Sequence, residues 1–187
     1  MEYLILSSLF FAINNVLWKW VVADYLPLQV IVKRSMVTSL FGVVVLCVSD
    51  FTIYTTLGEA LFVNLTCILG ALGLVFMIYA LKESTLNNFI HYSLLGSIGT
   101  ASYLYFVEDI VPQNYLLGIL LILLGFSIFL WNQRFTSKTV QFSTHRYLML
   151  MTLCFSISGI MQWYNLKTHG VVFLVIHQEI EVLIIAG

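Results

Sequence analysis

Charged residues are scarce in this chain: they make up 9% of its 187 residues, whereas soluble domains carry about a quarter. Apolar residues account for 60% of the chain. A water-soluble fold of this length has too little interior to hide so much apolar surface. The composition therefore excludes an ordinary soluble domain and favours a protein embedded in lipid. The net charge of −1 gives no reason to expect a nucleic-acid partner.

Motifs that carry chemistry are also lacking. The three cysteines, Cys47, Cys67 and Cys154, stand in apolar runs without CxxC or Cys/His spacing, which argues against a disulfide framework and a metal site. HExxH and GxSxG do not occur. We therefore expect no catalytic residue, no metal and no cofactor. Because no basic residue precedes the first apolar run, we interpret that run as a retained span rather than a cleaved signal peptide.

Long apolar runs are what the chain does contain. Crossing a hydrocarbon core of about 30 Å takes about 20 helical residues, and the backbone groups of each span must be satisfied within its own helix. The sequence predicts an all-α polytopic membrane helix bundle, multi-pass in the cell (inner) membrane, with about seven transmembrane helices. The expected spans are residues 3–22, 28–49, 59–81, 86–106, 115–131, 147–164 and 171–187.

Small residues recur on the faces of three of these spans. In lipid, close backbone approach at small residues is a main source of helix packing energy. We therefore expect helix contacts, rather than ligand sites, at Gly70, Ala71, Gly73, Gly96, Gly99, Gly118 and Gly125.

The sequence overlays itself when it is shifted by 144 residues. YLILSSLFFAI at 3–13 then lies on YLMLMTLCFSI at 147–157, with six of eleven positions identical, and Lys33 and Arg34 lie on His177 and Gln178. Because five crossings is an odd number, a second copy of a five-helix unit enters the membrane from the opposite side. This predicts an inverted repeat of the kind common in secondary transporters. The expected organisation is a first five-helix unit at 1–131, a polar linker at 132–146 and the first two helices of a second unit at 147–187.

Several short motifs accompany this pattern. An Ala-Leu-Lys segment with a following threonine closes the third span, an acidic residue follows the fourth, and a Leu-Gly run fills the fifth; asparagine, tryptophan and lysine mark the first span and an arginine the second. These residues are Ala80, Leu81, Lys82, Thr85, Glu108, Leu117, Gly118, Leu121, Ile122, Gly125, Asn14, Asn15, Trp18, Lys19 and Arg34. On them the chain resembles the EamA-type unit of the drug/metabolite transporter superfamily.

The resemblance covers residues 3–131 well and 147–187 in part. It implies a ten-helix fold of two five-helix halves and the transport, often the export, of small metabolites. One feature departs from the family: many members have a Ser-Pro pair in the fourth span, where this chain reads Gly96–Ser97–Ile98. A kink or gate that depends on that proline is not expected here.

Polar residues inside the spans are the candidates for a substrate path, because a Lys or Arg at a helix centre costs about 3 kcal/mol on insertion scales. Arg34 is expected to hold a substrate carboxylate or phosphate, whereas snorkelling to the headgroups is an equal alternative for Lys33. Lys19 lies near the end of its span, which favours a role as an anchor at the membrane interface. The candidate path residues are Asn14, Trp18, Lys33, Arg34, Asn87, His91, His177 and Glu181.

For two histidines, His91 and His177, the sequence suggests specific neighbours. His91 shares a helix face with Asn87, and the alternative to a functional role is a neutral ring bonded to a neighbouring helix. His177 and Glu181 are four residues apart and so able to pair, while Glu179 projects elsewhere. We expect Arg34, His91 and the His177/Glu181 face to line one cavity between the halves.

The leading hypothesis is an integral membrane secondary transporter that exports a small molecule, an amino acid or another metabolite. The alternatives are a membrane-embedded enzyme that uses the His177/Glu181 pair and a membrane assembly protein without transport activity. Because residues 147–187 match 3–43, the repeat predicts an incomplete transporter that inserts into the bilayer but needs a second copy, in a homodimer, to supply the missing surface.

Overall fold

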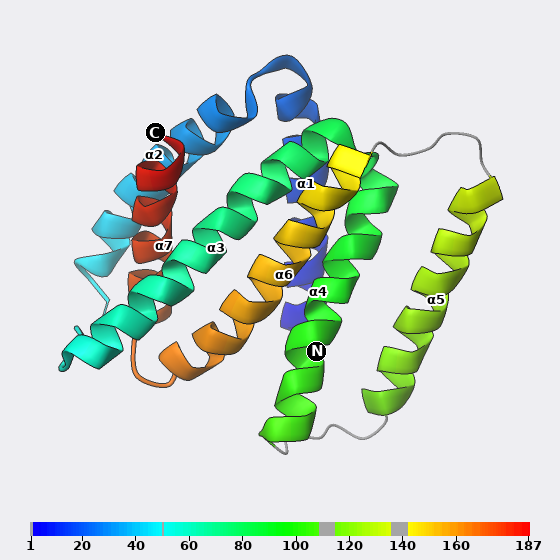
Figure 1. Cartoon of the computed structure of the whole chain (residues 1–187). Helices are drawn as coiled ribbons and strands as arrows, with labels where there is room; N and C mark the ends of the chain where they lie inside the picture. The colour runs from blue at the N-terminus through cyan, green and yellow to red at the C-terminus, as the bar shows by residue number, and fades with distance from the viewer. Residues whose placement is uncertain (1, 50, 109–114, 136–141) are drawn as a thin grey trace.

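The computed structural model describes residues 2–49, 51–108, 115–135 and 142–187 (Figure 1). Within them the secondary structure is entirely helical, so the predicted all-α class is confirmed. The seven helices are α1 (Glu2–Asp24), α2 (Pro27–Leu46), α3 (Leu57–Glu83), α4 (Leu86–Val107), α5 (Tyr115–Phe135), α6 (Phe142–Asn165) and α7 (Val171–Ala186). Each corresponds to one of the seven predicted spans. The largest differences are at α5 and α6, which extend by 4 and 5 residues into the predicted linker.

The helix ends follow local chemistry. Pro27 occupies the first turn of α2, where its missing N–H is not needed. Thr56 caps α3 by accepting a hydrogen bond from the Glu59 backbone N–H at 3.2 Å. Thr85 caps α4 in the same way through the Asn88 N–H at 3.3 Å. Each threonine satisfies a backbone N–H of the first turn that follows it, and therefore helps to fix where its helix begins.

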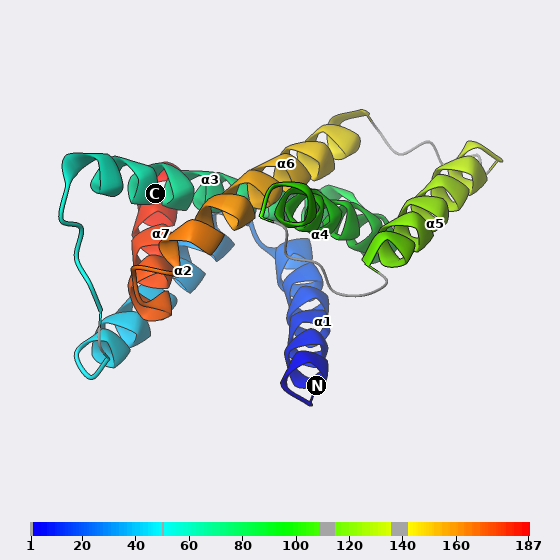
Figure 2. The same cartoon turned by 90° about the horizontal axis from the view of Figure 1, so that it is seen from below.

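Successive helices alternate in direction, and α3 lies across the middle of the assembly (Figure 1). It packs against α6 and α7 as well as against α2 and α1. The helices of the predicted second unit are thus packed among those of the first. The view in Figure 2 shows α1 reaching away from the layer that α3, α4 and α6 form, while α5 lies at the edge beside α4.

The outer surfaces are apolar, as lipid requires. Phe10 and Trp20 of α1 are 63% and 69% exposed, and Leu40 of α2 is 70% exposed. Among the residues that the structure describes, three helical segments are long and apolar enough to cross a membrane: α2, α3 and residues 145–165 of α6. These findings indicate a membrane protein. Seven membrane crossings and the inner membrane stay predictions.

The tightest helix contacts are at glycines. A Cβ on Gly73 would lie 2.7 Å from the Phe155 ring, and one on Gly99 would lie 2.9 Å from Ser156 Oγ. The prediction of packing faces is wrong for Gly118 and Gly125 of α5, where no described atom lies within 4 Å of such a Cβ. The reason is that α5 packs mainly against α4, and these glycines lie away from that contact.

Candidate functional site

An ion pair between α2 and α7 is the centre of the candidate site. Arg34 Nη1 lies 2.7 Å from Glu179 Oε1 and 2.8 Å from Oε2. Ser35 Oγ donates to the same Oε2 at 2.6 Å. The Glu179 side chain is 2% exposed, so its charge is buried, and burial of a carboxylate requires this kind of pairing and hydrogen bonding. Arg34 is therefore committed to a protein partner rather than to the headgroups.

The helices that carry this pair also correspond in the sequence repeat. Ser35 and Glu179 are separated by 144 residues, the shift that overlays the sequence on itself. α7 runs antiparallel to α2 (Figure 1). Away from the pair, Gly42 meets Ile176, while Val32 and Ala186 line one pocket. The 144-residue shift places Gly42 on Ala186 and Val32 on Ile176, so the two pairs are at corresponding positions of the repeat.

Two cavities lie on either side of Arg34. One, of about 350 Å³, lies between α1 and α2. The other, of about 330 Å³ and partly open, is lined by residues of α1, α3, α4 and α6, together with Arg34. Asn14, Trp18 and Arg34 line both. The Arg34 guanidinium carbon lies 6.0 Å from the Trp18 ring centroid, within the range of a cation–π contact. Trp18 and Arg34 therefore form part of a wall that the two cavities share.

The second cavity combines an apolar lining with hydrogen-bond acceptors. Its hydroxyl groups donate their protons to backbone carbonyls: Thr100 to Ser156 at 3.1 Å and Thr152 to Leu148 at 2.8 Å. Their oxygen lone pairs remain for a ligand. Asn15 is 4% exposed, and its Oδ1 has no hydrogen-bond partner among the described residues. The apolar lining is Leu74, Met77, Phe89, Met151 and Phe155.

Half of the predicted path residues meet at one cavity: Asn14, Trp18, Lys33 and Arg34 line the space between α1 and α2. His91 does not join them. Its ring stacks on Phe129 of α5, with centroids 3.9 Å apart. The Asn87 side chain lies outside the described residues.

The predicted pairing of His177 with Glu181 is present at 3.8 Å, but it faces α3, where His177 Nε2 lies 2.7 Å from Asn64 Oδ1. The prediction that Arg34, His91 and His177/Glu181 line one cavity is therefore wrong. Successive residues of a helix point about 100° apart, so neighbouring polar groups of α7 reach different helices. Gln178, next to His177, accepts a hydrogen bond from Gln162 of α6 at 3.0 Å.

Lys19 is also placed differently from the prediction of an interface anchor. Its Nζ donates to the carbonyl oxygens of Leu81 and Ser84, the latter at 2.6 Å. These carbonyls stand at the C-terminal end of α3, where a positive charge is stabilised by the helix dipole. Lys19 therefore fastens α1 to the end of α3.

Sequence reasoning missed Glu179 as the partner of Arg34 and Asn15 as a cavity residue. The first had a usable signal, because the repeat shift aligns Glu179 with Ser35, next to Arg34. The second had none: Asn14 and Asn15 are adjacent, and only the packing of α1 decides which of them is buried. Comparisons with protein-family models, curated proteins and solved structures found no match. The EamA-type resemblance therefore stays a prediction that rests on the motifs.

Proposed function

We propose that the protein is a secondary transporter of small metabolites, an exporter of the EamA type in the inner membrane, and that its substrate path runs through the two cavities beside Arg34. The buried Arg34–Glu179 pair carries this proposal. An ionisable group inside a membrane span is costly and is a marker of substrate and ion pathways. Here the guanidinium borders both cavities while its charge is balanced by a buried carboxylate.

The relation between α2 and α7 supports the same function. Transporters built from inverted repeats bind their substrates where the repeats meet, and they work by moving one repeat against the other. Ser35 and Glu179 meet at the position where repeat-related helices cross antiparallel. In this proposal the Trp18–Arg34 wall is the gate between the two cavities. A cation–π contact of about 0.5–2 kcal/mol is weak enough to break during a transport cycle.

The lining narrows the class of substrate. A volume of about 330 Å³ is at the small end of the range of about 300–1,000 Å³ for ligand sites. Arg34 and Glu179 cancel in charge, so the site favours a molecule with little net charge over a polyanion. The hydroxyl oxygens and Asn15 Oδ1 would accept from N–H or O–H groups, and the aromatic and methionine side chains would cover an apolar part. A small amino acid has these features, as do other metabolites of that size.

The alternative of a membrane-embedded enzyme gains no specific support. Its proposed acid/base pair, His177 and Glu181, lines neither of the two cavities described above, and His177 Nε2 is already 2.7 Å from an amide oxygen of Asn64. The proposed partners are therefore the lipid bilayer, a small-molecule substrate and a second copy of the chain, which would supply the missing surface in a homodimer.

The test is flux through purified protein in liposomes, measured with a panel of labelled small metabolites. Wild type should carry at least one of them, and Arg34→Gln/Glu179→Gln should abolish that flux, because the double variant removes both charges without leaving one buried alone. Glu83→Gln is the matched control: Glu83 is an exposed charged residue at the end of α3 that lines neither cavity, so its loss should leave the flux unchanged. Wild-type liposomes as impermeable as empty ones, or full flux by the double variant, would contradict the proposal.

A further inference from the structure

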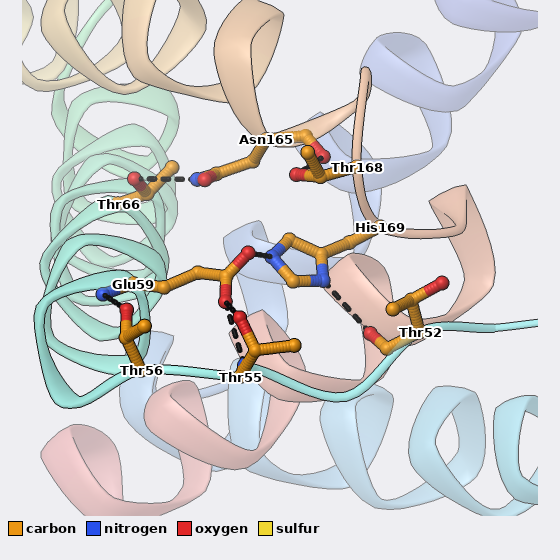
Figure 3. Close-up of polar contacts among 8 residues, drawn as sticks. All are labelled: Thr52, Thr55, Thr56, Glu59, Thr66, Asn165, Thr168 and His169. Atoms are coloured by element: carbon orange, nitrogen blue, oxygen red, sulfur yellow. Dashed lines mark hydrogen bonds and ion pairs between the residues drawn. The ribbon is translucent and has the colours of Figure 1, made fainter.

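A second polar cluster lies away from the two cavities, where the connection between α6 and α7 meets the start of α3 (Figure 3). His169 belongs to this connection, and its side chain is fully buried. Its Nδ1 lies 2.8 Å from the carbonyl oxygen of Thr52, and its Nε2 lies 3.5 Å from Glu59 Oε1. The imidazole ring is thus held between a backbone carbonyl and a carboxylate.

The two contacts fix where the ring carries hydrogen. A carbonyl oxygen only accepts, so Nδ1 must be the donor to Thr52. In a neutral ring Nε2 is then an acceptor, and it is buried with no hydrogen-bond partner in the described structure. Glu59 Oε1, 3.5 Å away, is an acceptor as well. A proton on Nε2 would convert two opposed acceptors into a charge-assisted donor–acceptor pair.

The surroundings of Glu59 favour its ionised form. Its other oxygen, Oε2, accepts from the Thr55 backbone N–H at 2.6 Å and from Thr55 Oγ1 at 2.9 Å. Hydrogen bonds that are donated to a carboxylate stabilise its charge. Glu59 also stands in the first turn of α3, where the helix dipole favours a negative charge. Of the two groups, His169 is therefore the one to take a proton that they share, and Glu59 the one to carry the negative charge.

Few other charges act on the ring. From the segment before α3, the Tyr54 ring packs edge-on to His169 at 6.2 Å; from α7, Phe173 lies at 5.8 Å. His177 lies on the other side of Tyr54, with Glu181 beside it. From the connection itself, Lys167 turns away, with its Nζ 3.8 Å from Glu108 and over the rings of Trp163 and Tyr164. Glu59 is thus the charged group in direct contact with His169.

We propose that His169 and Glu59 form a proton-binding site that fastens the α6–α7 connection to the segment before α3 when His169 is protonated. The two segments then share an ion pair in addition to the Thr52 hydrogen bond. Loss of the proton returns Nε2 to an acceptor facing a carboxylate, and the segments are held less tightly. Asn165, at the end of α6, stays anchored through its hydrogen bond to Thr66 at 2.9 Å, so the loosening is confined to the connection. Histidine is suited to this role because its charge ordinarily changes between about pH 5 and pH 8.

This inference does not depend on transport, and it can be tested without a substrate. The full chain, labelled with ¹⁵N-histidine in detergent micelles, is titrated across that pH range, and the His169 ring signals are assigned with His169→Gln. The Nε2 of His169 should gain its proton within the range. In Glu59→Gln the midpoint should fall by about one pH unit, a tenfold loss of proton affinity, because the charged ring loses its counter-charge.

Glu59→Gln keeps an amide oxygen for the Thr55 hydrogen bonds and should therefore fold. Glu181→Gln is the matched control, since it removes the carboxylate beside the other histidine and should leave the His169 midpoint unchanged. A His169 that stays unprotonated throughout the range, or a midpoint that is the same in wild type and Glu59→Gln, would overturn the site.

Hydrogen exchange tests whether protonation of His169 fastens the α6–α7 connection to the segment before α3. Wild type and Glu59→Gln are compared at equal pH, so that the intrinsic pH dependence of exchange cancels. Backbone amides in 52–56 and 166–170 should exchange more slowly in wild type than in Glu59→Gln at the acid end of the range. At the alkaline end that protection should be lost, because wild type then has two opposed acceptors while the amide N–H of Glu59→Gln is able to donate to the neutral ring. Equal exchange at the acid end would show that the proton does not fasten the two segments.

Discussion

Ser35 and Glu179 are 144 residues apart in the chain and 2.6 Å apart in space, joined by a hydrogen bond from a hydroxyl to a buried carboxylate. The same carboxylate holds Arg34. Three side chains from two helices thus satisfy one another inside a protein with almost no other buried charge in its described core. Both the stability of the protein and its proposed function depend on these three side chains. The effects of substitutions at any of them should therefore be compared with one another.

Removal of one partner should be costly. Glu179→Gln leaves Arg34 without its counter-charge, and breaking a buried ion pair costs about 3–5 kcal/mol. We expect the low end of that range, because the Arg34 side chain is 32% exposed. Chemical unfolding in micelles measures the loss. Arg34→Gln/Glu179→Gln should recover part of it, and a double variant as unstable as the sum of the single ones would argue against a direct pair.

A glycine in the α3–α6 contact should not tolerate a methyl group. Gly73→Ala would place its Cβ 2.7 Å from the Phe155 ring, and overpacking of this kind costs about 1–3 kcal/mol. The matched control is Gly118→Ala on α5, where nothing described lies within 4 Å. There alanine should raise stability by up to about 1 kcal/mol through helix propensity. Equal effects at the two sites would show that α3 and α6 are not packed as described.

Lys19 of α1, which bonds to the end of α3, should matter more for stability than Lys33 of α2. Lys19→Met removes a charged donor from the carbonyls of Leu81 and Ser84, and hydrogen bonds of charged groups are worth about 1.5–3 kcal/mol. Lys33→Met removes an exposed cation that has no polar partner in the described structure, so it should change stability by less than about 0.5 kcal/mol. The free energies of unfolding in micelles would be compared, and the reverse ranking would contradict the proposed role of Lys19.

Trp18 should limit access between the two cavities. In Trp18→Ala the shared wall loses its largest side chain, so a cysteine placed at Ser93, which lines the second cavity, should react faster with a small thiol reagent. The measurement is made in a background without the three native cysteines. Trp18→Phe, which keeps a ring in the wall, should react at an intermediate rate. An unchanged rate in Trp18→Ala would mean that Trp18 does not separate the cavities.

The apolar runs predicted the helices well because length and hydropathy decide what lies in lipid, and helix ends such as Pro27 and Thr85 were close to the predicted limits. Tertiary neighbours were less accessible to such reasoning. His91 was predicted to face a common cavity, but it stacks on Phe129, and the position of α5 at the edge has no sequence signal. The depth of Arg34 in the membrane stays a prediction. Its partner could have been suggested by the repeat shift, which aligns Glu179 with Ser35, but the contact itself depends on how α2 and α7 cross.

The polar residues of α7 have a consequence for biogenesis. This helix has 16 residues, and its polar side chains reach three neighbours: Glu179 contacts α2, His177 contacts α3 and Gln178 contacts α6. Each charged group costs about 2.5–3.5 kcal/mol at the centre of an isolated span, so α7 is a poor candidate to enter the bilayer alone. We expect it to wait at the translocon until its three neighbours are inserted, which makes the last helix described here a reporter of whether the preceding ones have assembled.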